Sequence, residues 1–143
     1  MPVFKRILVP IDGSETSNKA LATALGLASD IGARVRLVHC LDEHAYLGEH
    51  TGEVLKEALA TADKVLADGL VLANAAGVEA DTKLIDFSAQ RLGQVIFEAA
   101  RAFEADLVVL GSHGRRGIAR MLLGSGAEQI IRLASVPTLL IRG

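Results

Sequence analysis

Glycines and arginines gather in one stretch of the sequence where they could bind an anion. Gly111 and Gly114 let backbone N–H groups approach a bound group closely, because neither residue has a Cβ in the way. Arg115 and Arg116 follow at once and add positive charge that can reach phosphate oxygens. This stretch therefore predicts a phosphate site, and the structural alternative is a surface loop whose arginines are solvated.

A second anion-binding feature follows in the segment Gly124-Ser125-Gly126. Ser125 and Glu128 have the spacing of a capping box, which predicts the start of a helix. The first turn of such a helix offers unpaired N–H groups and the positive end of the helix dipole. The stretch is not a Walker A loop, because no Gly-Lys-Ser/Thr sequence follows. The dinucleotide fingerprint, which would follow the first strand, is absent as well.

One carboxylate is a candidate for the same site although it lies far away in the sequence. Asp12 follows the apolar run 7–9 after Pro10 and Ile11, so it is expected just beyond the carboxyl end of a strand. A carboxylate there can accept hydrogen bonds from ribose hydroxyls or lie near a phosphate-bound cation. The structural alternative is a helix cap, since Asp12 and Glu15 have capping-box character.

The remaining polar residues do not form a catalytic set. Val38 could pack on a base, whereas His39 is interpreted as a loop or edge histidine rather than a ligand. The four histidines lack the spacing of metal ligands, and Cys40 is expected to be partly buried and inert. No Gly-x-Ser-x-Gly elbow occurs. The sequence thus contains no nucleophile–base pair, and metal ligands remain unassigned.

Composition narrows the class of protein further. Hydrophobic residues make up 50% of the 143 residues but aromatic residues only 3%, so the core must consist of Leu, Ile, Val and Ala. A stacking platform for single-stranded nucleic acid is therefore not expected. The formal net charge of −2, without a charge run, indicates neither a nucleic-acid nor a membrane-surface partner. One cysteine and no long apolar run predict a cytoplasmic protein without membrane insertion.

Short apolar runs alternate with helical stripes along the chain, which predicts an α/β fold. Three continuous runs, at 7–9, 107–110 and 138–141, and a weaker fourth at 35–38 suit strands covered on both faces. One alternating segment, at 78–84, suits an edge strand. Apolar residues with helical period lie between them. Right-handed crossovers then give a parallel sheet with helices on both faces. Ligands in such sheets bind beyond the carboxyl ends of the strands, where Asp12 and Gly111 are expected.

Three blocks of the sequence together resemble the universal stress protein family over the whole chain. The most specific block is Gly-x2-Gly-x9-Gly-Ser, found at Gly111, Gly114, Gly124 and Ser125, which marks the ATP-binding branch of that family. The opening block 5–14 and the closing block 136–141 also look like the family. The resemblance implies one universal stress protein domain over residues 1–143. It further implies a five-stranded, Rossmann-like sheet of the adenine nucleotide alpha hydrolase type, in the order 3-2-1-4-5.

The resemblance also implies a ligand and the residues that bind it. ATP, ADP or AMP is the expected nucleotide, with Mg²⁺ as its companion ion and with Asp12 at the ribose or at that ion. Pro10, Ile11 and Val38 would line the adenine pocket. Leu110, the last residue of the apolar run 107–110, is also expected at the nucleotide. The phosphates would be wrapped by Gly111, Gly114, Gly124, Ser125 and Gly126, with Arg115 close by.

The family resemblance finally implies a partner and a role. A homodimer would form by antiparallel pairing of the last strands, Thr138 to Ile141, which would otherwise be an exposed apolar edge. The implied role is that of an ATP-binding regulatory protein in a stress response or in the control of a partner. Two alternatives stay open at this point. One is a slow ATPase or a phosphoryl or nucleotidyl transferase, and the other is a dimeric adaptor whose nucleotide is incidental.

Overall fold

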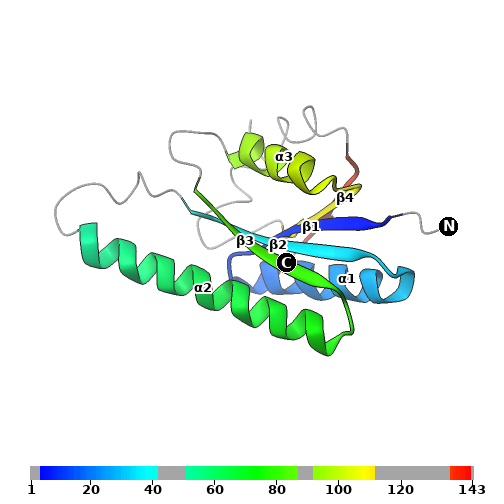
Figure 1. Cartoon of the computed structure of the whole chain (residues 1–143), viewed down its shortest axis with the longest axis horizontal. Helices are drawn as coiled ribbons and strands as arrows, with labels where there is room; N and C mark the ends of the chain where they lie inside the picture. The colour runs from blue at the N-terminus through cyan, green and yellow to red at the C-terminus, as the bar shows by residue number, and fades with distance from the viewer. Residues whose placement is uncertain (1–3, 42–50, 87–91, 112–135, 143) are drawn as a thin grey trace.

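The computed structural model describes residues 4–41, 51–86, 92–111 and 136–142, and the statements below concern these ranges. Five parallel strands form one sheet in the order β3-β2-β1-β4-β5 (Figure 1). The strands are β1 (Arg6–Pro10), β2 (Arg34–Leu41), β3 (Ala80–Asp86), β4 (Leu107–Gly111) and β5 (Thr138–Ile141). The predicted fold class and strand order are confirmed.

Three described helices cover the two faces of this sheet. They are α1 (Glu15–Ile31), α2 (Thr51–Ala75) and α3 (Leu92–Phe103). Helices α1 and α2 lie against one face and α3 lies against the other, as the right-handed crossovers predict (Figure 1). Helix α1 ends at its C-cap Gly32, which adopts the left-handed conformation. The helix predicted to begin near Ser125 lies outside the described residues.

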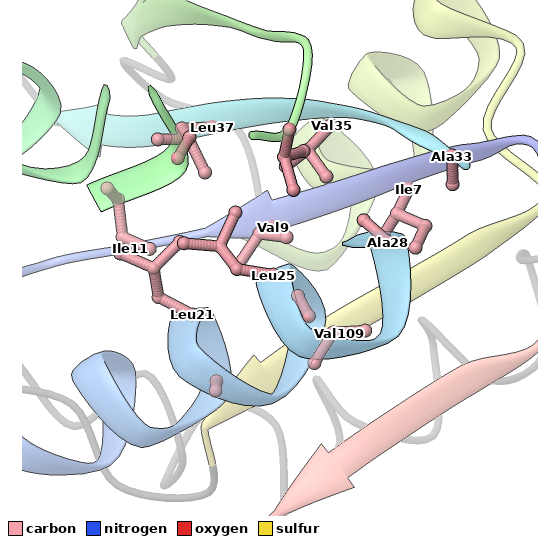
Figure 2. Packing of buried hydrophobic residues seen from close by; sticks show 14 of the residues in the cluster. Ile7, Val9, Ile11, Leu21, Leu25, Ala28, Ala33, Val35, Leu37 and Val109 are labelled. Carbon is pink, nitrogen blue, oxygen red and sulfur yellow. The ribbon is translucent and has the colours of Figure 1, made fainter. Parts of the chain in front are cut away.

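The core consists of two apolar layers, one on each face of the sheet. Side chains of Ile7, Val9 and Leu37 pack against α1 residues such as Leu21 and Leu25 (Figure 2). The alternate strand residues turn to the opposite layer, which contains Leu8, Val38, Val108, Leu110, Ile96, Ala100 and Phe103. Because both faces are covered, the central strands contain continuous apolar runs rather than alternating patterns.

The two edges of the sheet differ in their side chains. Strand β3 is an edge strand, as predicted, and it exposes Asp81 and Lys83. It begins two residues later than expected, because the Val78 N–H still bonds the Ala73 carbonyl of α2 at 2.9 Å. Strand β5 forms the other edge, and its Leu139 is 39% exposed. One edge is therefore charged and the other apolar.

Within the described ranges, we find no helix with both the length and the apolar character needed to cross a membrane.

Candidate nucleotide site

The candidate site lies where the sheet changes direction around its first strand. Strand β1 pairs with β2 on one side and with β4 on the other, in parallel register. Helix α1 leaves β1 toward one face, whereas the α3 connection reaches β4 from the opposite face (Figure 1). In open α/β sheets, ligands bind at such a switch point, beyond the carboxyl ends of the strands. The described residues there are the β1–α1 turn and the end of β4.

The turn after β1 holds Asp12 through hydrogen bonds within its own segment. Asp12 is 8% exposed, and its N–H donates to Ser17 Oγ at 2.9 Å. Its carboxylate oxygen Oδ1 accepts the Ser14 N–H at 2.9 Å. Gly13 between them has a φ of 82°, a conformation that favours glycine. These contacts give the carboxylate a defined place beside the start of α1.

The capping interpretation of Asp12 is wrong. The N-cap of α1 is Ser14, whose Oγ accepts the Ser17 N–H at 3.2 Å. The left-handed Gly13 reverses the chain after Asp12, so the helix begins only at Glu15. Asp12 therefore precedes the helix and supports the cap by accepting the N–H of the cap residue.

Gly111 meets the first turn of α1 at the end of β4. A Cβ placed on Gly111 would lie 2.8 Å from both the carbonyl carbon and the oxygen of Thr16, and 3.1 Å from the Ser17 nitrogen. These atoms belong to the backbone and cannot turn aside as a flexible side chain can. Glycine is thus required here by the packing of β4 on α1, a reason that the motif spacing alone does not reveal. The same contact brings the predicted phosphate strand and the Asp12 turn together.

The side chains expected around the adenine do not converge on one face. Ile11 is 3% exposed and belongs to the layer beneath α1 and α2, whereas Val38 and Leu110 belong to the layer beneath α3. Val38 is completely buried, and Pro10 is buried at the end of β1. Cys40 is the next β2 residue on the face of Val38, and it is only partly buried. Cys40 is therefore more accessible than Val38 on this face of β2.

The prediction that His39 lies in a loop or at an edge is wrong, and the residue contacts the backbone of the candidate site. It lies within β2, between β1 and β3, and so belongs neither to a loop nor to an edge strand. Its Nδ1 lies 2.8 Å from the carbonyl oxygen of Ile11, the residue before Asp12. The only signal in the sequence was its position directly after Val38, toward the carboxyl end of the strand.

Cys40 is partly buried, as expected. Burial raises its pKa to about 12, so it stays protonated at neutral pH. Among the described residues, no group of three or more His, Cys, Asp or Glu side chains could hold a metal ion. The remaining predicted phosphate ligands lie outside the described residues; they are Gly114, Arg115, Gly124, Ser125 and Gly126.

The sheet order and the crossovers define a doubly wound α/β protein. The model of the universal stress protein family matches residues 4–142, and the chain belongs to that family. A universal stress protein of Thermus aquaticus, named for the QAH/OAS sulfhydrylase 3′ region, is 35% identical over 142 residues. The alignment covers 98% of this chain and all of that protein.

Solved structures of universal stress proteins also match this chain. A universal stress protein family member from Burkholderia pseudomallei is 30% identical, with a TM-score of 0.78 and coverage of 96% of this chain and 95% of that one. An Archaeoglobus fulgidus structure in complex with dAMP is 21% identical, with a TM-score of 0.70 and 99% of each chain covered. An Arabidopsis thaliana structure with AMP bound is 15% identical, with a TM-score of 0.68 and coverage of 96% and 91%. These last two share the fold with this chain.

Proposed function

We propose that this chain, as a single domain, is an adenine-nucleotide-binding regulatory protein that acts as a cytoplasmic homodimer in a stress response or on a protein partner. The observation that carries the proposal is the contact between the end of β4 and the start of α1. Gly111 lies against the Thr16 backbone in the first turn of α1, directly after the turn that holds the buried Asp12. This is the switch point where the architecture accommodates ligands.

The residue types at this point suit a nucleotide. The Asp12 carboxylate can accept hydrogen bonds from ribose hydroxyls, and the glycine motif from Gly111 to Ser125 supplies backbone N–H groups for phosphates. Fold relatives with AMP and dAMP bound support an adenine nucleotide as the ligand. ATP is the form we propose, because the motif is that of the ATP-binding branch.

Mg²⁺ fits this site as a companion of the nucleotide. Asp12 offers one buried carboxylate, of which Oδ1 already accepts the Ser14 N–H. Mg²⁺ commonly binds through one or two carboxylates together with substrate phosphates, and keeps several waters. The ion would neutralise phosphate charge, while Asp12 would hold it beside the β1–α1 turn.

The homodimer is proposed from the exposed edge of the sheet. Strand β5 has β4 as its neighbour on one side, and Leu139 on it is exposed. An unprotected apolar edge strand favours pairing with another strand. Antiparallel pairing of two copies of Thr138–Ile141 would give the backbone groups at the edge of each copy a hydrogen-bond partner. Leu139→Lys should therefore shift the protein toward monomer in light scattering, whereas unchanged dimer mass would exclude this interface.

The nucleotide is tested first by identifying what the protein carries. Freshly purified protein is denatured, and the released small molecules are identified by mass spectrometry; we expect ATP, ADP or AMP. Added ATP should raise the unfolding temperature and GTP should raise it less. At a concentration 100 times the dissociation constant, the stabilisation would be roughly 2.7 kcal/mol. Protein that carries no adenine nucleotide and shows no shift with ATP would exclude the proposal.

A matched pair of glycine variants tests the motif itself. Gly114→Val should abolish the ATP-dependent shift, because a bulky side chain would stand between the backbone and the phosphates. Gly26→Ala is the control, since a Cβ at Gly26 of α1 would meet nothing within 4 Å. Phosphate release measured on the same samples separates regulation from hydrolysis. Turnover that Asp12→Ala abolishes while binding persists would favour an ATPase instead.

A further inference from the structure

The peptide group between Ile11 and Asp12 is held from both of its polar atoms. Its carbonyl oxygen, on Ile11, lies 2.8 Å from His39 Nδ1. Its N–H, on Asp12, donates to Ser17 Oγ at 2.9 Å. Just before it, the Ile11 N–H donates to the Val38 carbonyl at 2.8 Å. These hydrogen bonds therefore restrict the orientation of the backbone that carries Asp12.

The three contacts come from different parts of the chain. The Val38 contact continues the β1–β2 ladder, and Ser17 belongs to the helix that follows the turn. The His39 contact instead joins a side chain of the neighbouring strand to a carbonyl 28 positions away in sequence. Helix formation supplies Ser17 in any case, whereas the His39 contact depends on one side chain. Its loss would release one side of the peptide.

The chemistry of this contact fixes the state of the imidazole. A backbone carbonyl can only accept a hydrogen bond, so Nδ1 must carry the proton. In the neutral ring, Nε2 is then the acceptor, which defines the Nδ1–H tautomer. The ring is partly buried, where the loss of a carbonyl partner is costlier than at an open surface.

We propose that His39 is a positioning residue for the candidate nucleotide site. Its Nδ1–H donates to the Ile11 carbonyl, fixes the Ile11–Asp12 peptide and so sets the direction of the Asp12 carboxylate. The inference rests on the proposed nucleotide binding, and it deepens it by naming a residue that acts without touching the ligand. Through this hydrogen bond, the position of β2 determines where Asp12, the residue expected at the ribose, is placed.

Three variants separate the hydrogen bond from the shape of the ring. His39→Phe keeps a ring but removes the donor, and His39→Ala removes both. His39→Asn keeps a donor near the position of Nδ1. We expect the first two to weaken ATP binding about fivefold to tenfold, the effect of one such hydrogen bond. The asparagine variant should stay within about twofold of the wild type.

The binding assay is isothermal titration of the full chain with ATP and Mg²⁺, at a temperature where every variant is folded. Thr23→Ala is the control, because Thr23 Oγ1 also donates to a backbone carbonyl, that of Lys19, but on the exposed face of α1. It should bind ATP like the wild type. Equal affinities of the phenylalanine, asparagine and wild-type proteins would overturn the role of His39.

A double-mutant cycle asks whether His39 acts through Asp12. In an Asp12→Ala background, His39→Phe should have little further effect on ATP affinity, because no carboxylate is left to orient. A merely structural role of His39 would instead give the same loss in both backgrounds. Additive effects would therefore overturn the proposal even if His39→Phe weakens binding.

Nitrogen NMR of the wild-type imidazole tests the geometry without any variant or nucleotide. The proposal requires Nδ1–H in the folded protein, and an Nε2–H tautomer with unprotonated Nδ1 would overturn it. The two proposals fail in different ways. If the wild type binds no adenine nucleotide, the proposed function is lost and the role of His39 falls with it. If the wild type binds and His39→Phe binds equally well, only the role of His39 is lost.

Discussion

The contacts that stabilise the turn after β1 differ in kind from those between strands β2 and β3 at one side of the sheet. At the turn, buried groups of Asp12 and Ser17 and the bare Cα of Gly111 fit against one another. Between β2 and β3, Arg36 donates two hydrogen bonds to the Asp81 carboxylate, at 2.8 and 2.9 Å, but Asp81 is 54% exposed. Water replaces a hydrogen-bond partner more easily at the exposed pair than at the buried Asp12 and Ser17. Single substitutions should therefore cost much more at the turn.

The largest expected effect is that of Gly111→Ala. The added methyl group would lie 2.8 Å from the Thr16 backbone, so β4 or α1 must move. Overpacking of this kind costs about 3 kcal/mol of unfolding free energy, which urea denaturation measures. The same change at Gly26, where a Cβ meets open space, should stabilise α1 by up to about 1 kcal/mol. Equal unfolding free energies of the Gly111→Ala and Gly26→Ala proteins would contradict the expected difference between the buried contact and the open surface of α1.

A smaller loss is expected for Ser17→Ala. The substitution removes the buried oxygen that accepts the Asp12 N–H, while the rest of the helix stays intact. Loss of a buried hydrogen-bond partner costs about 1–2 kcal/mol in unfolding free energy. Thr23→Ala deletes an exposed hydroxyl of the same helix and should change stability by less than about 0.5 kcal/mol. Calorimetric unfolding of both variants compares them, and a Ser17→Ala protein as stable as Thr23→Ala would contradict the expectation.

The smallest effect is expected at the exposed pair. Hydrogen bonds from Arg36 hold the pKa of Asp81 below its ordinary value, while the same contact raises the pKa of Arg36. Because the folded-state pKa of Asp81 is the lower one, its contribution is present above about pH 4 and is lost as the pH falls through the folded-state value. Asp81→Asn should cost below about 1 kcal/mol at pH 7, since the pair is solvent-screened.

Measurements at different salt concentrations and pH values test whether Asp81 contributes through its charge. The difference between wild type and Asp81→Asn should shrink in high salt and should vanish in acid, when both are unfolded by urea. A difference that stays constant from pH 7 to pH 3 would mean that Asp81 contributes through something other than its charge.

The sequence predicts the strands well because their cause is local. Ile7, Val9 and Val108 lie in continuous apolar runs, which are typical of strands covered on both faces, and all three are buried. The run 138–141 also forms a strand, but at the exposed edge of the sheet, where none of its residues is fully buried. The family motifs then supply the order of the sheet. The start of β3 was predicted two residues too early, because Val78 has a strand-like residue type but its N–H is bonded to the end of α2.

The site could be predicted only in part, because its remaining contacts are tertiary. Asp12 and Ser14 are both good N-cap residues, and the choice between them depends on the left-handed Gly13. The motif names Gly111 for the phosphates, but its contact with Thr16 joins residues from opposite halves of the chain. The hydrogen bond of His39 to Ile11 likewise depends on how β2 lies beside β1.

The contrast between the two edges of the sheet has a consequence for how copies of the chain can assemble. A pair joined through β5 would bury the apolar Leu139 edge of each copy and would leave the charged β3 edges outermost. Asp81 and Lys83 on those edges discourage a further strand from adding. Such a pairing closes on itself, so the joined sheet is a finite particle rather than the start of a fibre.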